Sequence, residues 1–364
     1  MRVLNLLASG NLAGIEKLNI DINRYSTHTH YYCFMFKGGA AADQLKADGA
    51  YVNVLNIRIK HSVFQQYKAI NRIIEENRIE AIMVHHETPL AWVISSIISK
   101  KKKIPFYLYA HCEYKDIVGI SDGNCLKKIY KKKTFEYALE HCHKVIAISK
   151  YVSNSITERY DYIRNKISIV YNGVDTDVFS PDYFHKAKEF TIIYVGRLVR
   201  QKGVNLLIDA LANVKSPVKC IIVGGGNEKN SLEKQVQDRE LTSVVTFAGV
   251  QKNTKDWYKK GTIFVHPAVW EEGFGITIIE AMASGLPCIS FKKGALPEII
   301  ENGVNGFIVD NCSAESMAEI IDRLYEMFNY NLESFNCLRN NAVNTASNFN
   351  IHKTVSLLDV LLHV

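Results

Sequence analysis

Short apolar runs alternate with amphipathic stretches along the chain, and this alternation limits the available folds more than any other feature. The stretch at 63–76 has helical spacing, with Phe64, Tyr67, Ile70 and Ile74 on one face. Strand-like runs separated by helices predict parallel sheets in an α/β fold. The strand-like runs are 2–8, 31–36, 51–57, 81–86, 105–110, 144–149, 167–172, 190–196, 219–225, 244–249, 262–267, 287–291 and 306–310.

The runs fall into two series, one in each half of the chain, which predicts two domains. A chain of 364 residues exceeds the ~250–300 at which a single core usually divides. Asn-Gly at Asn172 and Ser-Pro at Ser180 interrupt the chain between the two series. We therefore predict two doubly wound, Rossmann-like domains at 1–170 and 171–349. The apolar spacing at 350–364 indicates a last helix that is able to pack back on the first domain.

Positive charge is concentrated in the first domain. Residues 1–170 carry a net charge of +10 and the rest carry −3, which gives +7 overall. Much of the excess lies in two segments, Lys100–Lys103 and Lys127–Lys133. A solvated basic face explains this pattern, and so does a surface for an anionic partner such as a membrane or a phosphate-bearing acceptor. Nucleic acid is disfavoured, because no recognition motif accompanies the charge.

The segment at 125–142 adds Leu126, Ile129, Tyr130 and Phe135 to these lysines. Interfacial helices mix apolar and basic residues in this way. Core helices whose lysines extend to solvent have the same composition. Both interpretations stay open, and attachment to the inner face of the cell membrane is a hypothesis that follows from the first.

Cysteine spacing and the N-terminal sequence indicate a cytoplasmic location. The eight cysteines are scattered without a C-x-x-C pair, which is typical of reduced thiols. The first apolar run passes directly into a glycine-containing turn, so it predicts a strand rather than a signal peptide. No apolar run reaches the roughly 18 residues of a membrane-spanning helix. No His, Cys or Asp spacing indicates a metal site.

The stretch WEEGFGITIIEAM, Trp270–Met282, combines glycines with a helical pattern. Gly273 and Gly275 allow the backbone to approach a ligand closely. A helix that begins at Ile276 would offer free backbone amides, which favour phosphate. This unit predicts a phosphate-binding turn between a strand and a helix.

The same stretch carries three glutamates, Glu271, Glu272 and Glu280. Eight residues of continuous helix would span ~12 Å. We therefore expect Glu272 and Glu280 to lie farther apart than the ~5–5.5 Å of a retaining hydrolase pair. The two carboxylates either hold different parts of one long ligand or are ordinary surface charges. The sequence assigns no role to Glu271.

Basic residues crowd the turn after the run at 190–196. Arg197, Arg200 and Lys202 precede the amphipathic stretch at 203–211. Cations at the carboxyl end of a parallel strand suit a diphosphate, and the alternative is surface charge on a loop.

The first half of the chain offers less specific candidates. Gly10 and Gly14 flank the first strand-to-helix turn, and His111 follows a buried strand, as His85 and His86 do. Most turns of this kind contain a glycine, and a lone histidine is more often structural. These residues point to a ligand only in combination with the stretches above.

Taken in order, these stretches resemble the family 4 retaining glycosyltransferases, which have the GT-B fold. The resemblance covers nearly the whole chain and is strongest from Ile167 to Ile308. It implies two Rossmann-like domains that face each other across a cleft, the first for the acceptor and the second for the nucleotide sugar. The motifs that carry it are YNGVD at 171–175, YVGRLVRQKG at 194–203, IIVGGG at 221–226 and HPAVWEEGFGITIIEAMASGLPCIS at 266–290.

The resemblance implies roles for individual residues. Arg197 and Lys202 would hold the donor diphosphate and stabilise it as it leaves. Glu272 would face the hydroxyls of the transferred sugar, and Glu280 those of the ribose. His111 would contact the donor sugar near the reacting carbon. The other donor-site residues that it implies are Gly14, Asn172, Gly196, Val250, Gly273, Phe274, Gly275, Ile276 and Thr277.

The implied activity is transfer of a sugar, with retention, from a nucleotide diphosphate sugar to a glycan, lipid-linked or cell-surface polysaccharide acceptor. A UDP-sugar is favoured over a GDP-sugar, and no metal or other cofactor is expected. One departure from the family pattern is Ala13 before Gly14, where two glycines are usual. Two alternatives stay open: an inactive subunit that holds a sugar nucleotide for a partner enzyme, and a phosphorylase or epimerase on the same fold. The sequence does not give the oligomeric state.

Overall fold

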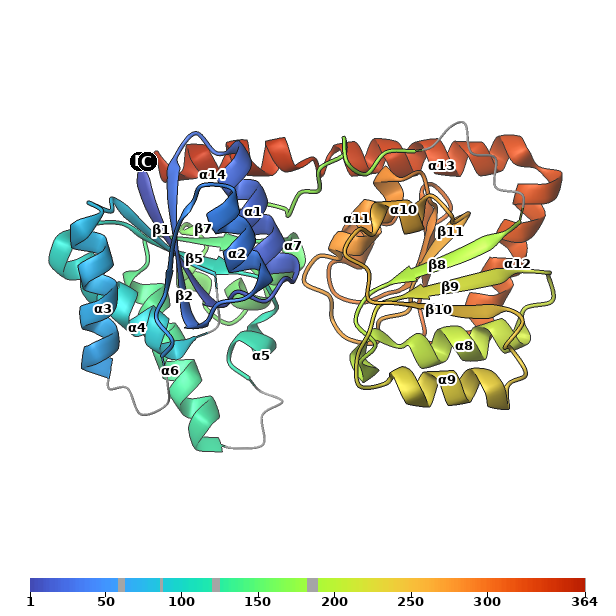
Figure 1. Cartoon of the computed structure of the whole chain (residues 1–364), viewed down its shortest axis with the longest axis horizontal. Coiled ribbons are helices and arrows are strands. Elements are labelled where there is room, and N and C mark those ends of the chain that lie inside the picture. Colours follow the sequence, from blue (N-terminus) through green and yellow to red (C-terminus); the bar gives the residue numbers. More distant parts are fainter. Residues whose placement is uncertain (58–62, 86–87, 120–124, 182–188, 364) are drawn as a thin grey trace. The chain divides into compact units, whose positions relative to one another are not determined.

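The computed structural model describes residues 1–57, 63–85, 88–119, 125–181 and 189–363. The chain forms two compact units (Figure 1), Met1–Gly173 with Ile351–Val364, and Val174–Asn350. The first unit therefore ends close to the predicted division after Val170. His86, which we expected to end a strand, lies outside the described residues.

Within the described ranges, the first unit is built on a seven-stranded parallel sheet in the order β3-β2-β1-β4-β5-β6-β7. Each strand coincides with one of the apolar runs of the first series. The chain winds outward from the centre of the sheet in both directions, starting at the neighbours β1 and β4. The strands are β1 (Arg2–Ser9), β2 (Thr29–Lys37), β3 (Tyr51–Val54), β4 (Ala81–Val84), β5 (Phe106–Ala110), β6 (Lys144–Ala147) and β7 (Ile167–Ile169).

Helices cover both faces of this sheet (Figure 1). One face carries α1 (Gly14–Tyr25), α2 (Ala40–Ala47) and the C-terminal α14 (Ile351–Leu362), and the other carries α3 (Val63–Glu76), α4 (Pro89–Lys102) and α6 (Cys125–His141). Shorter elements complete the unit: α5 (Tyr114–Ile117), α7 (Lys150–Thr157) and η1 (Asp161–Ile163).

The helix α3 corrects one prediction. Its buried stripe contains Ile70 and Ile74, as expected, but also Gln66 and Ile73. Phe64 is 62% exposed, and the Lys68 ammonium lies 4.6 Å from its ring centre. The buried side is set by α4, against which α3 packs, so the helical period is right but the face is rotated.

The helix α14 belongs to the first unit, far from the rest of that unit in sequence. Asp359 accepts hydrogen bonds from the Ser26 hydroxyl at 2.6 Å and from the Thr27 amide and hydroxyl, both at 2.7 Å. Burial alone would raise the pKa of Asp359, but these donors hold it below its usual range. A charged hydrogen-bond cluster thus ties the end of the chain to the loop before β2.

Within the described residues, the second unit is built on a six-stranded parallel sheet in the order β10-β9-β8-β11-β12-β13. The winding is the same as in the first unit, with β8 and β11 as the central neighbours. The strands are β8 (Thr191–Val195), β9 (Lys219–Val223), β10 (Val245–Gly249), β11 (Ile263–His266), β12 (Cys288–Phe291) and β13 (Gly306–Val309). The other elements are η2 (Arg200–Lys202), α8 (Val204–Asn213), α9 (Lys229–Asp238), α10 (Lys255–Tyr258), α11 (Ile276–Ala283), η3 (Leu296–Glu298), α12 (Ala314–Tyr330) and α13 (Leu332–Ser347).

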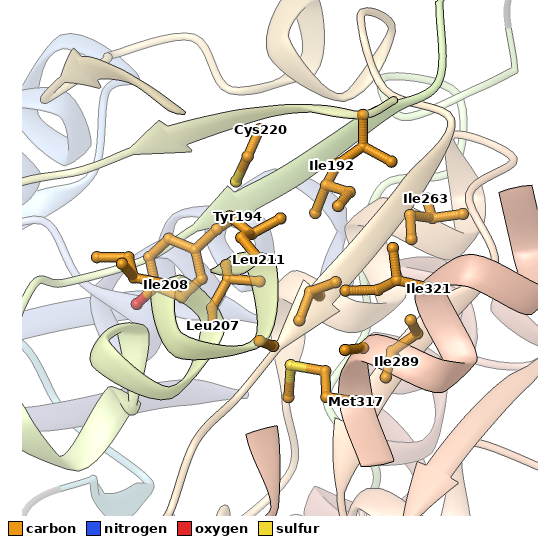
Figure 2. Packing of buried hydrophobic residues seen from close by; sticks show 14 of the residues in the cluster. Ile192, Tyr194, Leu207, Ile208, Leu211, Cys220, Ile263, Ile289, Met317 and Ile321 are labelled. Carbon is orange, nitrogen blue, oxygen red and sulfur yellow. The ribbon is translucent and has the colours of Figure 1, made fainter. Parts of the chain in front are cut away.

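The main core of the second unit lies between the sheet and the helices α8 and α12. Figure 2 shows Ile192, Ile263 and Ile289 of the strands packed toward Leu207 of α8 and Met317 of α12. These side chains are fully buried. Removing such apolar area from water is the main favourable contribution to folding, so this core fixes the sheet whose edge carries the polar residues described below.

In the described part of the chain, no helix is both long and apolar enough to span a membrane. The eight cysteines are free thiols.

Candidate active site

The centre of the second sheet brings the predicted charged residues together. Open α/β sheets bind ligands at the carboxyl ends of strands, where the winding direction changes. In this sheet the change falls between β8 and β11, which pair directly. Arg197 and Lys202 lie in the loop after β8, and Glu272 lies in the loop after β11. The topology alone therefore places the two cations and the carboxylate at one edge.

A partly buried charge cluster occupies this edge. The Lys202 ammonium donates to Glu272 Oε1, and His266 Nε2 lies 3.2 Å from the same oxygen. The side chains of Lys202 and Glu272 are 21% and 15% exposed. Burial lowers the pKa of His266 despite the opposing carboxylate, so the ring is neutral at pH 7 and donates its Nε2 proton. Burial would raise the pKa of Glu272, but the His266 hydrogen bond and the Lys202 charge hold it well below its usual range.

Local backbone geometry forces Lys202 toward Glu272. Gly203 follows η2 with φ 63, and a Cβ at this position would lie 2.0 Å from the carbonyl oxygen of Pro267. Only glycine allows such an approach. The Val269 amide also donates to the Gln201 carbonyl at 3.0 Å. The loops after β8 and β11 are thereby fastened together, with their charged side chains opposed.

Arg197 is held differently from Lys202. The Tyr194 hydroxyl donates to the Arg197 carbonyl at 3.0 Å, which fixes the backbone at this position. The Arg197 side chain is exposed. Within the described part of the chain, its guanidinium makes no hydrogen bond or ion pair. Arg197 thus presents a cation from a fixed backbone position.

The helix α11 begins where the sequence predicts, at Ile276. Gly275 precedes it with φ 100, a left-handed conformation that favours glycine, and supplies no side-chain cap. The first-turn amides of Ile276 and Thr277 point out of the helix start, as in other anion-binding helix N-termini. The buried carboxylate of Glu280, one turn further, accepts a 2.9 Å hydrogen bond from the Tyr258 hydroxyl. Burial and this neighbouring carboxylate raise the pKa of Tyr258, so the hydroxyl remains a donor.

Glu271 has a structural role that the sequence did not reveal. Its carboxylate accepts the Gly294 amide at 2.6 Å and lies 3.3 Å from the Lys293 ammonium. The Ala295 amide donates to the Glu272 carbonyl at 2.8 Å. Glu271 therefore holds the loop after β12 against the loop that carries Glu272.

Phe274 and Val250, two further residues that we predicted in the donor site, differ in exposure. The Phe274 ring is buried and packs edge-on against Phe349, with centroids 5.4 Å apart, so its backbone is the part available to a ligand. Val250 follows β10 and is 79% exposed. The carbonyls of Ala248 and Gly249 beside it accept hydrogen bonds from the Gln251 side chain at 2.6 Å and from the Gly224 amide at 2.8 Å.

The predicted residues of the first unit lie at or near the carboxyl edge of its own sheet. Gly14 begins α1 directly after the β1 loop, and His111 follows β5. His111 Nε2 lies 3.2 Å from Nδ1 of His85, the residue after β4. Asn172 lies after β7 and is buried, and within the described residues its Oδ1 has no hydrogen-bond partner.

Sequence reasoning missed His266 and Tyr258. His266 stands six residues before Glu272 at the end of a predicted strand, so its placement could have drawn attention to it. Tyr258 has no comparable signal, because α10 and α11 meet only in the fold. Among the residues that the structure describes, no group of three or more His, Cys, Asp or Glu side chains could hold a metal ion.

Family models match both halves of the chain. The model of glycosyl transferases group 1 matches residues 175–341, and the model of Glycosyltransferase Family 4 matches residues 27–178. The chain belongs to the family 4 glycosyltransferases. Its fold is GT-B, as the resemblance implied, and the predicted glycosyltransferase family is confirmed.

Individual relatives are distant. The glycosyltransferase is 28% identical over 257 residues to an uncharacterized glycosyltransferase of Methanocaldococcus jannaschii, covering 70% of this chain and 68% of that one. It is 31% identical over 172 residues to a GDP-mannose-dependent phosphatidylinositol monomannoside mannosyltransferase of Mycobacterium tuberculosis, covering 42% and 45% of the two chains. Among solved structures, Anabaena HepE in complex with UDP is similar with a TM-score of 0.86, 23% identity and full coverage of both chains.

The charge cluster makes a prediction about stability. Lys202→Met leaves the Glu272 carboxylate without its ammonium partner, so we expect it to lower the free energy of unfolding by about 1–3 kcal/mol. Lys202→Met with Glu272→Gln removes both charges and should cost less than Lys202→Met alone. Urea unfolding followed by tryptophan fluorescence measures these differences. Equal costs for the single and double variants would contradict a coupled pair.

The same cluster fixes the sign of a pH effect. The pKa of Glu272 is lower in the folded chain than its unfolded value of about 4.3. Its contribution to stability is therefore fully present above about pH 4.3 and is lost as the pH falls through the folded pKa. Glu272→Gln should accordingly lose less stability than the unaltered chain between about pH 5 and pH 3.

Proposed function

We propose that this glycosyltransferase transfers a sugar, with retention, from a nucleotide diphosphate sugar to a glycan, lipid-linked or cell-surface polysaccharide acceptor. The observation that carries the proposal is the Lys202–Glu272–His266 cluster at the centre of the second sheet, with Arg197 and the start of α11 in the adjoining loops. The cations and the free amides suit a diphosphate, and the carboxylate is a hydrogen-bond acceptor that suits the hydroxyls of a sugar.

The donor diphosphate is the part of the substrate that the cations fit. Breaking the sugar–phosphate bond leaves extra negative charge on the diphosphate, and fixed positive charge stabilises that state more than the ground state. Arg197 is already exposed for this role, and the Lys202 ammonium can turn from Glu272 to a phosphate oxygen. The amides of Ile276 and Thr277 add neutral donors. These groups supply the charge stabilisation that a divalent ion gives in other transferases, so we propose transfer without a metal.

Glu272 and Glu280 fit different parts of the donor. Glu272 is ionised and can only accept hydrogen bonds, so it would bind hydroxyl groups of the transferred sugar. Glu280, on α11, accepts a hydrogen bond from Tyr258 of α10 and would bind the ribose hydroxyls. Their separate partners support two distinct contacts rather than an acid/base pair. In this scheme no carboxylate attacks the sugar. The acceptor approaches from the face that the diphosphate leaves, and the leaving phosphate takes the proton of the acceptor.

We favour a UDP-sugar over a GDP-sugar as the donor. A solved structure of the same fold, HepE, contains UDP. A mycobacterial relative is named for its dependence on GDP-mannose, which makes guanine the alternative. Val250 and the backbone beside it, at the end of β10, are the residues that we expect to meet the base.

Variants of two arginines in the loop after β8 test whether Arg197 acts on the donor diphosphate. We expect Arg197→Ala to lower kcat/KM for sugar transfer by about a hundredfold or more, because it removes a cation that acts on the leaving diphosphate. Arg200→Ala is the matched control, since Arg200 is also exposed in this loop but has no proposed contact. The assay measures release of nucleoside diphosphate from UDP-, GDP- and ADP-sugars in the presence of lipid-linked and glycan acceptors.

Equal rates for Arg197→Ala and the unaltered enzyme would remove Arg197 from the mechanism. Binding of a sugar nucleotide without any acceptor-dependent release would favour the inactive-subunit alternative. Loss of transfer on adding a chelator would contradict the metal-independent scheme.

An anionic membrane surface is the partner that we propose for the basic side of the first unit. In the helix α6, which Figure 1 labels, Leu126 is 78% exposed, Ile129 52% and Tyr130 48%, and lysines stand between them in the sequence. Phe135 is fully buried, so only the first half of the helix has an interfacial character. An open pocket of about 460 Å³ beside α6 has one carboxylate, Glu158, and four cationic side chains among its lining residues: Lys115, Lys128, Lys132 and Arg159.

The basic segment Lys100–Lys103 has a different environment from that of α6. Lys102 pairs with Glu75 at 2.7 Å, and the Lys101 ammonium lies 5.2 Å from the Tyr67 ring centre. These lysines at the end of α4 are partly engaged with α3. We therefore propose that Lys127–Lys133 contacts lipid and that Lys100–Lys103 contributes mainly long-range attraction. A peripheral position on the inner face of the cell membrane would follow.

Flotation with liposomes tests the membrane proposal. We expect the enzyme to float with vesicles that contain anionic lipid and not with neutral vesicles. Leu126→Ser with Ile129→Ser should reduce flotation, because it removes the exposed apolar side chains. Leu332→Ser is a control, since Leu332 is 56% exposed in the second unit. Equal flotation with neutral and anionic vesicles, or none with either, would rule out the proposed surface.

A further inference from the structure

The carboxylate of Glu272 accepts both of its hydrogen bonds on the same oxygen. The Lys202 ammonium donates to Oε1, and His266 Nε2 lies 3.2 Å from Oε1. Among the residues that the structure describes, none donates to Oε2. Each carboxylate oxygen has two lone pairs, so the two donors fill Oε1 and leave Oε2 as the oxygen that a ligand can use.

The two donors differ in how firmly they are held. His266 is the last residue of β11, where it stands opposite Ser290 of β12, and its side chain is only 4% exposed. Its ring lies over the Phe264 ring, with centroids 6.3 Å apart and planes inclined by 28°. Lys202 reaches Glu272 through a flexible stem of four methylene groups, and its side chain is 21% exposed. The imidazole is therefore a fixed donor and the ammonium a movable one.

The surroundings of His266 define one tautomer. Glu272 is ionised and its oxygen only accepts, so the contact requires a proton on Nε2 of His266. Nδ1 is buried, and within the described part of the chain it has no hydrogen-bond partner. A second proton on Nδ1 would be a buried donor without an acceptor, which is costly. His266 therefore gives Glu272 one directed N–H and no charge.

A turn of Lys202 to a phosphate oxygen takes the ammonium away from Glu272. A largely buried carboxylate that loses its counter-charge is costly unless another hydrogen bond holds it. The bond from His266 to Oε1 stays in place, because the strand fixes its donor. We infer that His266 is a positioning residue, which holds the Glu272 carboxylate while Lys202 turns to the diphosphate and so lowers the cost of that turn. The inference rests on the proposed function for the identity of the ligand.

The backbone contacts of the two loops do not replace this support. The Ala295 amide fixes the Glu272 carbonyl at 2.8 Å, and the close approach of Gly203 to Pro267 fixes the chain beside Lys202. These contacts hold main-chain atoms and leave the carboxylate free to rotate. Within the described residues, the hydrogen bonds to the carboxylate itself come from Lys202 and His266. Without His266, the orientation of the carboxylate would therefore depend on the ammonium that has to move.

Calorimetric titration of the full-length protein with nucleotides tests this role without an assay of transfer. The ligands are the diphosphate that the unaltered protein binds among UDP, GDP and ADP, and the matching monophosphate. We expect His266→Phe to weaken diphosphate binding by about tenfold or more, because Lys202 then leaves a carboxylate without a partner. Monophosphate binding should be unchanged, since it does not require Lys202 to turn. His266→Gln, whose amide can donate near the former Nε2, should recover most of the loss. Equal weakening of both nucleotides would show a merely structural role and overturn the inference.

The variant Glu272→Gln provides a second, independent test. A neutral amide at this position needs no counter-charge, so Lys202 can turn to the diphosphate without help. We therefore expect His266→Phe to have little effect on diphosphate binding when it is combined with Glu272→Gln. The same weakening by His266→Phe with and without the carboxylate would contradict the inference.

Nitrogen NMR of the protein labelled with ¹⁵N-histidine reads the state of His266 in the unaltered chain, so it does not depend on the folding of a variant other than His266→Gln, which assigns the signal. We expect a neutral ring with its proton on Nε2, both without a ligand and with the diphosphate bound. A proton on Nδ1, or loss of the Nε2 hydrogen bond when the diphosphate binds, would overturn the inference.

The inference and the proposed function fail in different ways. If the unaltered protein binds none of the three diphosphates, the proposed function fails and the inference fails with it. If the protein binds one of them and His266→Phe binds it equally tightly, only the inference fails, and the assignment of Arg197 is untouched.

Discussion

The ion pair between Lys202 and Glu272 is the interaction on which the functional part of the second unit depends. A carboxylate that is largely withdrawn from water is costly unless it is paired and hydrogen-bonded. Here the pairing comes from an ammonium on the loop after β8 and a neutral imidazole, His266, at the end of β11. The cluster therefore joins two loops whose strands are neighbours only because of the winding of the sheet. Gly203 and Glu271 hold the backbone that makes the pairing geometry available.

The two units use the same architecture for different chemistry. In the second unit, the switch in winding direction gathers full charges, Arg197, Lys202 and Glu272, which suits a ligand that carries phosphate. In the first unit, the equivalent edge gathers two histidines, and His111 Nε2 lies 3.2 Å from His85 Nδ1. Charged groups tolerate some solvent, but buried polar side chains need hydrogen-bond partners in fixed orientations, and Asn5 bonds both His30 and His85 in this way.

Much of the fold was accessible from sequence because its signals are local. Each predicted strand corresponds to an observed one, since runs of buried β-branched and aromatic residues flanked by turns have few other interpretations. The start of α11 at Ile276 was likewise marked by Gly275. The face of α3 was predicted less well, because the rotation of a helix is set by its neighbour α4 rather than by its own period.

The contacts within the site were less accessible, because they join residues that are distant in sequence. Nothing near Tyr258 marks it as the partner of Glu280, and Glu271 is explained only by the Gly294 amide that it caps. In the first unit, hydrogen bonds link Asn5 through His30 and Ser26 to Asp359, which stands 354 positions further along the chain. Spacing indicated which residue types were present, but only the fold shows which atoms face each other.

The central claim is that Arg197 and Lys202, beside Glu272, bind the diphosphate of a nucleotide sugar. Hydrogen exchange of the backbone amides, measured by mass spectrometry with and without UDP, tests it most directly. The account predicts slower exchange at 197–203 and 273–280 with UDP, and a smaller effect at 197–203 with UMP, which lacks the second phosphate. Unchanged exchange in both segments at a UDP concentration that saturates binding would contradict it.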